Sequence, residues 1–199
     1  MTDPATRNRL RRELRVQRNG LSAAQQTLAA QQLSNQVAAL RQFRVSRRVA
    51  LYLPNDGEID PLPLMLRLWQ SGKTCYLPIL SPLRHDRLWF APYLPDTTLT
   101  VNRLGILEPV TPARAWTRAQ GLDLILMPLV GFDIQGNRLG MGGGFYDKSL
   151  AFLRHRRAWH KPQLIGLAHD FQLVKKIEIN TWDVPLQAVA TDRQVYTFG

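Results

Sequence analysis

Residues 122–148 read L-D-L-I-L-M-P-L-V-G-F-D-I-Q-G-N-R-L-G-M-G-G-G-F-Y-D-K, and this stretch decides the fold class. The run from Leu122 to Met127 is short and apolar without alternation, which is typical of a strand buried on both faces. Six glycines then follow between Gly131 and Gly144, and a helical pattern begins directly after them. The stretch therefore predicts a buried strand, a long glycine-rich loop and a helix.

Further helices and strands are expected on both sides of this stretch. Asp3-Pro4 is typical of a helix start, and Ser22-Ala-Ala-Gln25 has the spacing of a capping box, so two helices are expected within roughly residues 4–40. Two more are expected, from Asp60-Pro61 to Gly72 and from Phe145 or Tyr146 to about Arg157. Strands are expected over the apolar segments Arg48–Leu53, Thr74–Ile79, Arg87–Tyr93, Leu164–Ala168 and Gln187–Phe198, the last as one or two edge strands.

Strand–helix alternation with continuously apolar strands favours an α/β fold with a mainly parallel sheet. With 45% hydrophobic and 21% charged residues, the composition is that of a globular protein and excludes a disordered or low-complexity chain. Neither an internal repeat nor a linker is visible in the sequence. We therefore expect residues 1–199 to form a single domain.

The positive charge is concentrated at the N-terminus. The chain carries 26 Lys+Arg and 15 Asp+Glu, a net charge of +11, and residues 1–48 alone hold ten arginines with Asp3 and Glu13 as their acids, a net +8. This pattern predicts a basic N-terminal helical arm and an anionic partner.

The single cysteine, Cys75, excludes an internal disulfide and a cysteine-built metal site. It lies in an apolar run, which favours a small core residue over a reactive thiol. The N-terminal region lacks the apolar segment of a secretory signal, and the longest apolar stretch is too short to span a bilayer. We expect a soluble, cytoplasmic protein that does not bind a membrane.

Glycines between a buried strand and a helix are typical of a phosphate-binding loop, because the backbone can approach the anion and direct several N–H groups at it. A helix end contributes only about 0.3–1 kcal/mol, so a triphosphate would also need cationic side chains or a metal. Arg138 and Lys148 are candidates for the cations, and Asp147 is a candidate ligand for magnesium.

Two standard nucleotide-binding motifs do not fit this loop. A Walker motif beginning at Gly142 would need glycine where Asp147 stands, and a Rossmann motif beginning at Gly140 or Gly142 would need glycine at position 145 or 147. The residues alone leave open a mobile surface loop in which Asp147 merely begins a helix.

Four segments of the sequence resemble the 5-formyltetrahydrofolate cyclo-ligase family. Residues 136–148, G-N-R-L-G-M-G-G-G-F-Y-D-K, resemble its glycine-rich signature, and residues 7–22, with the core L-R-R-E-L-R, resemble its basic first helix. Residues 51–60, L-Y-L-P-N-D-G-E-I-D, and residues 182–187, W-D-V-P-L-Q, resemble its first strand with the substrate loop and its C-terminal motif. The resemblance implies a three-layer α/β/α fold and an enzyme that uses ATP and magnesium to convert 5-formyltetrahydrofolate to 5,10-methenyltetrahydrofolate, releasing ADP and phosphate.

The resemblance also implies roles for individual residues. Its implied metal ligands are Asp147 and Asp183, and its implied catalytic groups are Arg138, Tyr146 and Lys148. The implied ATP-binding residues are Arg7, Arg11, Arg138, Leu139, Gly140, Met141, Gly142, Gly143, Gly144, Phe145 and Tyr146. The implied folate-binding residues are Leu53, Glu58, Met141, Gly142, Gly143, Gly144 and Phe145. The sequence departs from the family pattern at Arg7, where lysine is usual, at Met141, a variable position, and at Phe145, where tyrosine is frequent.

Other interpretations remain open from the residues alone. Glu58 and Asp183 would each ordinarily be exposed loop acids, and Arg7 with Arg11 a solvated helix face. A nucleic-acid-binding module would use the arginine arm, but no such motif is visible. A sugar-phosphate or coenzyme A enzyme on a similar scaffold would not need ATP. We expect a monomer that acts on small molecules and binds no nucleic acid.

Two further groups have no assigned task. Arg44, Arg47 and Arg48 extend the basic arm, and His169-Asp170 follows a predicted buried strand. Adjacent residues usually point apart, so His169 and Asp170 are expected to be a loop pair.

Overall fold

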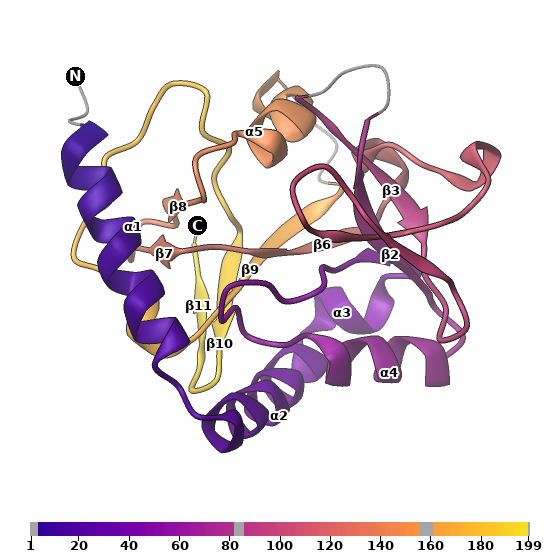
Figure 1. The fold of residues 1–199 in the computed structure, drawn as a ribbon, viewed down its shortest axis with the longest axis horizontal. Coiled ribbons are helices and arrows are strands. Elements are labelled where there is room, and N and C mark those ends of the chain that lie inside the picture. Colours follow the sequence, from indigo (N-terminus) through magenta and orange to yellow (C-terminus); the bar gives the residue numbers. More distant parts are fainter. Residues whose placement is uncertain (1–3, 82–85, 156–160, 199) are drawn as a thin grey trace.

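The computed structural model describes residues 4–81, 86–155 and 161–198. Within these ranges a central sheet of seven strands has the order β11-β10-β9-β6-β1-β2-β3 (Figure 1). The five inner strands run parallel, and β3 and β11 run antiparallel to their neighbours. The strands are β1 (Arg48–Ala50), β2 (Thr74–Leu80), β3 (Leu88–Pro92), β6 (Leu124–Pro128), β9 (Gln163–Ala168), β10 (Ala188–Thr191) and β11 (Val195–Thr197).

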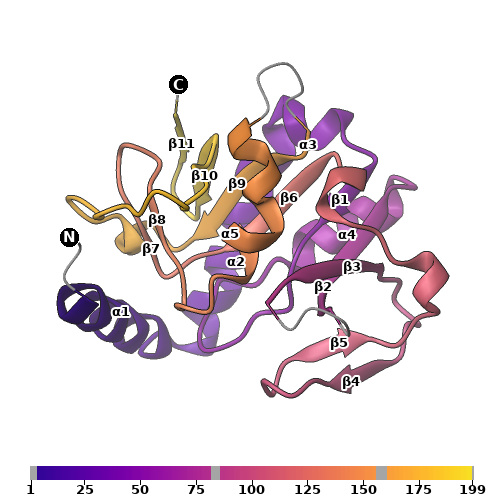
Figure 2. The ribbon, with the colours of Figure 1, turned by 90° about the horizontal axis from the view of Figure 1, so that it is seen from above.

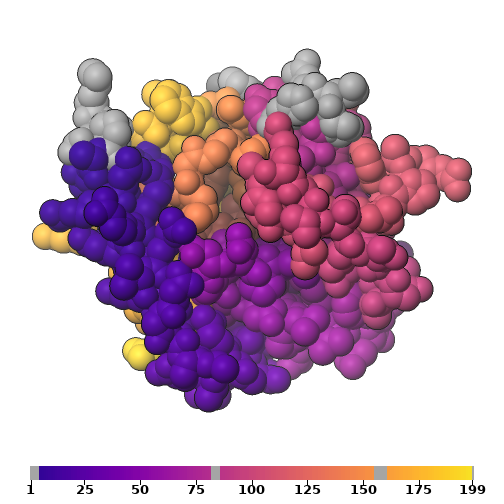
Figure 3. Space-filling view, viewed as in Figure 1, coloured from indigo at the N-terminus to yellow at the C-terminus, as the bar shows by residue number. Residues whose placement is uncertain are grey.

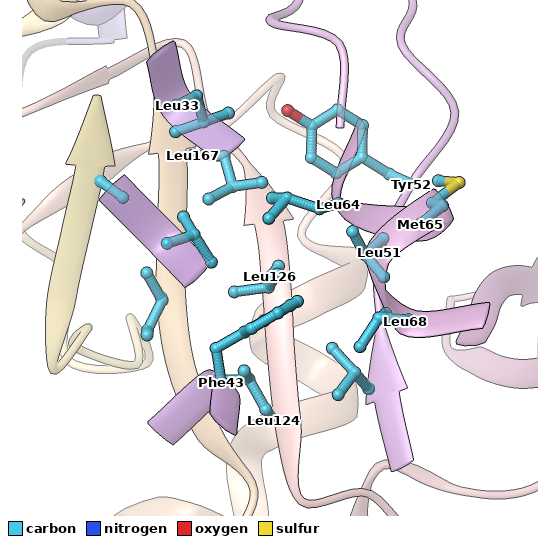
Figure 4. Close-up of a cluster of buried hydrophobic side chains, with 14 of the residues drawn as sticks. Leu33, Phe43, Leu51, Tyr52, Leu64, Met65, Leu68, Leu124, Leu126 and Leu167 are labelled. Atoms are coloured by element: carbon cyan, nitrogen blue, oxygen red, sulfur yellow. The ribbon is translucent and has the colours of Figure 1, made fainter. Parts of the chain in front are cut away.

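Helices cover both faces of this sheet (Figure 2). On one face lie α2 (Ala23–Ala39), α3 (Arg41–Val45) and α4 (Leu62–Gln70). Figure 4 shows their buried side chains, among them Leu33, Phe43 and Leu64, against Leu124 and Leu126 of β6. On the other face lie α5 (Phe145–Leu150) and a 3-10 helix over Ala151–His155. The expected three-layer α/β/α architecture with a mainly parallel sheet is confirmed.

Helix α1 (Pro4–Asn19) lies to one side of these layers, as Figures 1 and 2 show. Leu14 packs there against Val130 and Leu139, with Leu10 at the edge of the same cluster. Ser22 then begins α2 with the expected capping box, in which its hydroxyl accepts the N–H of Gln25. The basic N-terminal helical arm is therefore confirmed, and its apolar residues attach it to the body.

Several boundaries differ from those expected. β1 ends at Ala50 rather than Leu53, because the chain leaves the sheet there to form a wall of the cavity described below. α5 ends at Leu150 and continues only as a 3-10 helix; Asp3 and the expected helix end at Arg157 lie outside the described residues. β10 is not an edge strand, because it pairs with β9 as well as with β11.

Several smaller elements were not predicted, because their local sequence patterns are weak. The glycine-rich stretch contains a short hairpin of β7 (Gly131–Phe132) and β8 (Arg138–Leu139), and a second hairpin joins β4 (Leu99–Val101) to β5 (Leu107–Pro109). Three 3-10 helices span Ala113–Ala115, Ala119–Gly121 and Asp170–Gln172.

Cys75 is completely buried in the core, as expected, and burial raises the pKa of its thiol to about 12. Among the described residues, no helix is both long and apolar enough to cross a membrane.

The connections between strands diverge at the carboxyl ends of two central strands. β1 leads through α4 on one face to β2, whereas its other neighbour, β6, leads through α5 on the opposite face to β9. The chain therefore diverges at the carboxyl ends of β1 and β6. In open α/β sheets, ligands bind at such a switch point.

Candidate active site

A cavity of about 1200 Å³ opens at this switch point. Figure 3 shows its mouth as a hollow between the indigo helix α1, the orange segment that leads into α5 and the pink β4–β5 hairpin. The loop after β1 and residues 178–183 complete the walls. The predicted site residues that line it are Arg7, Arg11, Leu53, Glu58, Arg138, Gly140, Met141, Gly142, Gly143, Gly144, Phe145, Tyr146, Asp147 and Asp183.

The glycine loop forms one wall with its backbone in conformations that only glycine adopts easily. Gly142 has a φ of 101°, and Gly144, the residue before α5, has a φ of 66°. Such left-handed conformations strain a residue that carries a Cβ atom. At Gly142 that Cβ would also stand 3.8 Å from the guanidinium carbon of Arg11, so the loop runs close to a cation.

Helix α1 supplies that cation and a second one. Arg7 and Arg11 lie one turn apart and both face the cavity. The Nε of Arg11 donates to the carbonyl of Gly140 at 2.8 Å, which ties the helix to the glycine loop. Burial, and then the neighbouring charge of Arg7, lower the pKa of Arg11. Two partly buried like charges at one wall favour an anionic ligand.

Two carboxylates lie near each other on the next wall. Asp147 Oδ1 accepts the N–H of Val184 at 3.1 Å, and Asp183 is the residue before Val184. Asp183 Oδ2 accepts the N–H of Asn180 at 2.9 Å and stands 3.8 Å from Arg7 Nη1. The fold therefore joins two acids that are 36 positions apart in the sequence.

Arg138 connects Asp147 to the segment that contains Asp183 and Val184. It is largely buried, pairs with Asp147 and donates to the carbonyl of Val184. Its guanidinium is thus engaged with the carboxylate that was expected to bind a metal. In this arrangement it orients Asp147 as well as lining the cavity.

The chemistry of this pair of acids would suit a magnesium ion whose other ligands are phosphate oxygens and water. Within the described residues no group of three or more His, Cys, Asp or Glu is placed to hold a metal. Mg²⁺ typically uses one or two protein carboxylates and completes its coordination with phosphate oxygens and water. Asp147 and Asp183, beside a glycine loop and two arginines, match that requirement.

Glu58 lines the opposite side of the cavity and is nearly buried, with its side chain 12% exposed. Burial raises its pKa from 4.5 to about 7, against the opposing effects of the Arg18 charge and the Asn55 N–H. The hydroxyl of Tyr52 donates to the carbonyl of Ile59 at 2.8 Å and fixes the same loop from below. Glu58 is therefore not the exposed turn acid that the local sequence alone would suggest.

Leu139 and Lys148 are the two predicted site residues that do not line this cavity. Leu139 is buried against Leu14 and supports the loop from behind. Lys148 is half exposed and stands 3.7 Å from Asp86. The structure therefore does not bring Lys148 to the same wall as Arg138 and Tyr146.

Sequence reasoning missed one buried cation and several parts of the cavity wall. Arg18 is completely buried beside Asp56, although Arg7, Arg11, Leu14 and Arg18 follow a four-three-four spacing that places them on one face of α1. Asn102 and Leu104 of the β4–β5 hairpin also line the cavity. No strong pattern marked that hairpin in advance.

The residues without an assigned task remain outside the cavity. Arg48 donates to the hydroxyl of Tyr76 at 3.1 Å, and Arg47 uses its backbone N–H to bond Asp123. His169 precedes a 3-10 helix, and the Asp170 carboxylate accepts the hydroxyl of Thr191. As expected for adjacent residues, His169 and Asp170 turn to different partners.

Comparison with known proteins gives one consistent result. Residues 3–192 match the sequence profile described as the 5-formyltetrahydrofolate cyclo-ligase family. The 5-formyltetrahydrofolate cyclo-ligase of Escherichia coli K12 is 41% identical over 183 residues, which cover 92% of this chain and 98% of that protein. The Haemophilus influenzae protein of the same name is 40% identical, with 90% and 94% covered.

A solved structure agrees with these relatives. The 5,10-methenyltetrahydrofolate synthetase of Aquifex aeolicus superimposes with a TM-score of 0.79 at 28% sequence identity, covering 96% of this chain and 92% of that one. The Mycoplasma pneumoniae synthetase, 24% identical with a TM-score of 0.71, shares the fold.

Proposed function

The chain belongs to the 5-formyltetrahydrofolate cyclo-ligase family, and from that premise we propose that it converts 5-formyltetrahydrofolate to 5,10-methenyltetrahydrofolate, using ATP and releasing ADP and phosphate. One observation carries the proposal. A single cavity brings together Arg7 and Arg11, a glycine loop, two carboxylates and the buried Glu58. This combination supplies a polyphosphate site and an acceptor for a nitrogen-rich ring within reach of each other.

ATP binds along the glycine wall in this proposal. Backbone N–H groups of Gly140 to Gly144 bond the phosphate oxygens, and Arg7 and Arg11 supply the positive charge. Leu139 does not contact ATP in this proposal; it packs in the core and holds the loop in place. Asp147 and Asp183 would hold magnesium, which when bound neutralises phosphate charge as it develops.

Folate binds on the opposite side. The carboxylate of Glu58 accepts N–H donors of the pterin, and Leu53 and Phe145 contact its faces. Met141 and the backbone of Gly142 to Gly144 lie between this side and the phosphates, so they contact both substrates. The two reacting groups are thereby brought together without water between them.

The reaction itself needs no nucleophile from the protein. The formyl oxygen attacks the γ-phosphorus of ATP, and ADP leaves with the electron pair of the broken P–O bond. The substrate's N10 then attacks the activated carbon, loses its proton, and phosphate departs as the ring closes. The protein contributes positioning and charge stabilisation, for which Arg138 and Tyr146 are the proposed groups at the cavity wall. Lys148, the third proposed group, would act from outside the lining, next to Gly144.

We further propose that residues 1–199 act as one cyclo-ligase domain, as a monomer, in the cytoplasm. Arg7 and Arg11 face the cavity and Arg18 is buried, so part of the N-terminal charge serves small anions rather than nucleic acid.

A direct assay tests the proposal. The protein is mixed with 5-formyltetrahydrofolate, ATP and magnesium, and the absorbance of the methenyl product is followed. We expect turnover that disappears when either ATP or magnesium is omitted. Absence of product with folded protein and excess magnesium would refute the assignment, and turnover without ATP would support an enzyme of another class.

A further inference from the structure

Arg18 is a fully buried cation that the proposed chemistry does not use. Its side chain is 0% exposed, on the same face of α1 as Arg7 and Arg11. Its Nε donates to the carbonyl of Asp56 at 3.0 Å and its Nη2 to the Asp56 carboxylate at 2.8 Å. A buried charge costs several kcal/mol unless it is paired, so this guanidinium is held in place by specific partners.

The partners of Arg18 come from both sides of the switch point. Asp56 belongs to the loop after β1, and the carbonyl of Leu129, 3.5 Å from Arg18 Nη1, belongs to the chain after β6. Gln172 donates to the same Leu129 carbonyl at 2.9 Å from a third segment. The guanidinium therefore connects the two strand ends between which the cavity opens.

The loop after β1 is pressed closely onto this end of α1. A Cβ atom at Gly57, where φ is 72°, would stand 2.9 Å from Asn19 Oδ1 and 3.0 Å from the backbone of Arg18. Gln26 of α2 donates to the carbonyl of Gly57 at 3.2 Å. The segment that ends in Glu58 is thus seated on the helix by backbone as well as side-chain contacts.

Asp56 and Glu58 both lie near the Arg18 charge, but only Asp56 forms hydrogen bonds with it. The Asp56 carboxylate accepts hydrogen bonds from Arg15, Arg18 and Asn19 at 2.6, 2.8 and 2.9 Å. Glu58 Oε1 stands 4.0 Å from Arg18 Nη1, beyond hydrogen-bond distance, and its Oε2 accepts only the Asn55 N–H, at 3.2 Å, among the bonds found in the described chain. Glu58 therefore feels the positive charge while its oxygens stay open to the cavity.

We propose that Arg18 is a positioning residue for Glu58: it fixes the Asp56–Glu58 loop against the end of β6, and its charge favours a Glu58 carboxylate that can accept hydrogen bonds from the folate. This inference rests on the proposed function. Arg18 itself touches neither substrate, because it is fully buried and lies outside the cavity lining. Its Nη1, the nitrogen nearest Glu58, donates to the carbonyl of Leu129.

The charged and titratable groups around Glu58 support this role. They are Arg18 from α1, Asp56 from its own loop, Tyr52 from the end of β1 and Tyr146 from α5. Burial is the larger influence and raises the Glu58 pKa to about 7, and Arg18 is the first opposing influence. Replacing Arg18 by a neutral residue removes the chief influence that opposes protonation of this carboxylate near neutral pH.

The test uses wild-type enzyme with Arg18→Met, Arg18→Lys and Arg15→Met, measuring the KM for each substrate across pH. Arg15→Met is the matched control, because Arg15 bonds the same Asp56 carboxylate from an exposed position outside the cavity lining. In Arg18→Met we expect the KM for 5-formyltetrahydrofolate to rise at least about tenfold, since a hydrogen bond to a charged group is lost. The pH below which its folate KM rises, called the acid limb of the profile, should move up by about one pH unit or more. The KM for ATP should stay within about twofold, since the phosphate wall is unchanged.

Arg18→Lys separates charge from geometry. It keeps the positive charge and cannot bridge Asp56 and Leu129 as a planar fork does. We expect its acid limb to match the wild type while the folate KM is raised about threefold or more. Should Arg18→Met not fold, this variant and Glu58→Gln decide the matter. Glu58→Gln must remove the acid limb, which assigns it to Glu58 rather than to His169, a buried group that faces Arg18.

An unshifted acid limb in folded Arg18→Met, or equal increases in both KM values, would overturn the inference, as would an unchanged folate KM in Arg18→Lys. Inactive wild-type enzyme would instead refute the proposed function. A fall in kcat alone, with both KM values unchanged, would assign Arg18 a purely structural role.

Discussion

Arg11 donates its Nε–H to the carbonyl of Gly140 at 2.8 Å, across 129 positions of the sequence. This bond joins the N-terminal helix to the glycine loop, so the basic arm and the proposed phosphate site form one surface. Arg11 thereby has two functions: its Nε holds the loop, and the side chain also lines the cavity, where its Nη1 donates to the Asn8 side chain at 2.7 Å.

Replacing Arg11 by Met should weaken ATP binding. A charge-assisted hydrogen bond is worth roughly 1.5–3 kcal/mol, so we expect the KM for ATP to rise about ten- to a hundredfold, with a smaller change in the folate KM. Steady-state kinetics with each substrate varied in turn measures this. The exposed neighbour Arg12, replaced by Met, is the control, and an equal effect in Arg12→Met would mean that only overall charge matters.

Gly142→Ala should disturb the glycine loop while leaving the fold intact. The φ of 101° strains a residue with a Cβ atom, at a cost of about 1–3 kcal/mol if the loop keeps its shape. We expect the loop to shift and ATP affinity to fall, as isothermal titration would show. Gly140→Ala should cost less, because its φ is ordinary and a Cβ there meets nothing within 4 Å. Equal losses in both variants would contradict this explanation.

Asp183→Asn should raise the magnesium concentration needed for half-maximal rate. A neutral amide is a weaker ligand for Mg²⁺ than a carboxylate, and the bond from the Asn180 N–H to the side chain can be kept. A magnesium titration of the rate measures the shift. Asp86→Asn removes an exposed acid outside the cavity lining and should leave the titration unchanged. An unchanged magnesium requirement in Asp183→Asn would exclude this residue as a ligand.

Glu58→Gln should stabilise the protein at alkaline pH while it weakens folate binding. The Glu58 pKa rises from 4.5 to about 7 on folding, so the folded state holds its proton more tightly, and stability is lost as pH rises through this range. The shift corresponds to at most about 3 kcal/mol of lost stability above the folded pKa.

Urea unfolding of wild type and Glu58→Gln, at about pH 5 and about pH 8, measures this difference. We expect the advantage of the variant to be small at the lower pH and to reach its full size at the higher one. An advantage that is the same at both pH values would show that the pKa of Glu58 is not raised on folding. Folate binding by the same samples shows whether the more stable variant also binds folate more weakly.

Local patterns predicted most of the fold and much of the site. Unalternating apolar runs predicted the inner strands β2, β6 and β9 to within about two residues. The weak signals between residues 81 and 120 hid the β4–β5 hairpin, because its exposed faces carry mixed polar and apolar residues. That hairpin nevertheless forms part of the cavity wall, which pairing and burial decide rather than local propensity.

The sequence by itself determined the chain order of the main strands and helices, the glycine loop and the basic character of the first helix. These depend on neighbouring residues through periodicity, capping and glycine's backbone freedom. The tertiary structure alone decided what each arginine on α1 does. Arg11 faces a cavity and Arg18 is sealed beneath it, although both are the same residue on the same helix face.

Their difference arises from partners far along the chain. Asp56 and Leu129 lie 38 and 111 positions from Arg18, and only the packing of the loops after β1 and β6 brings them to the end of the helix. Burial then raises the pKa of Glu58, which lies next to them. Charge and residue type are local properties, whereas desolvation and hydrogen-bond geometry depend on the whole fold.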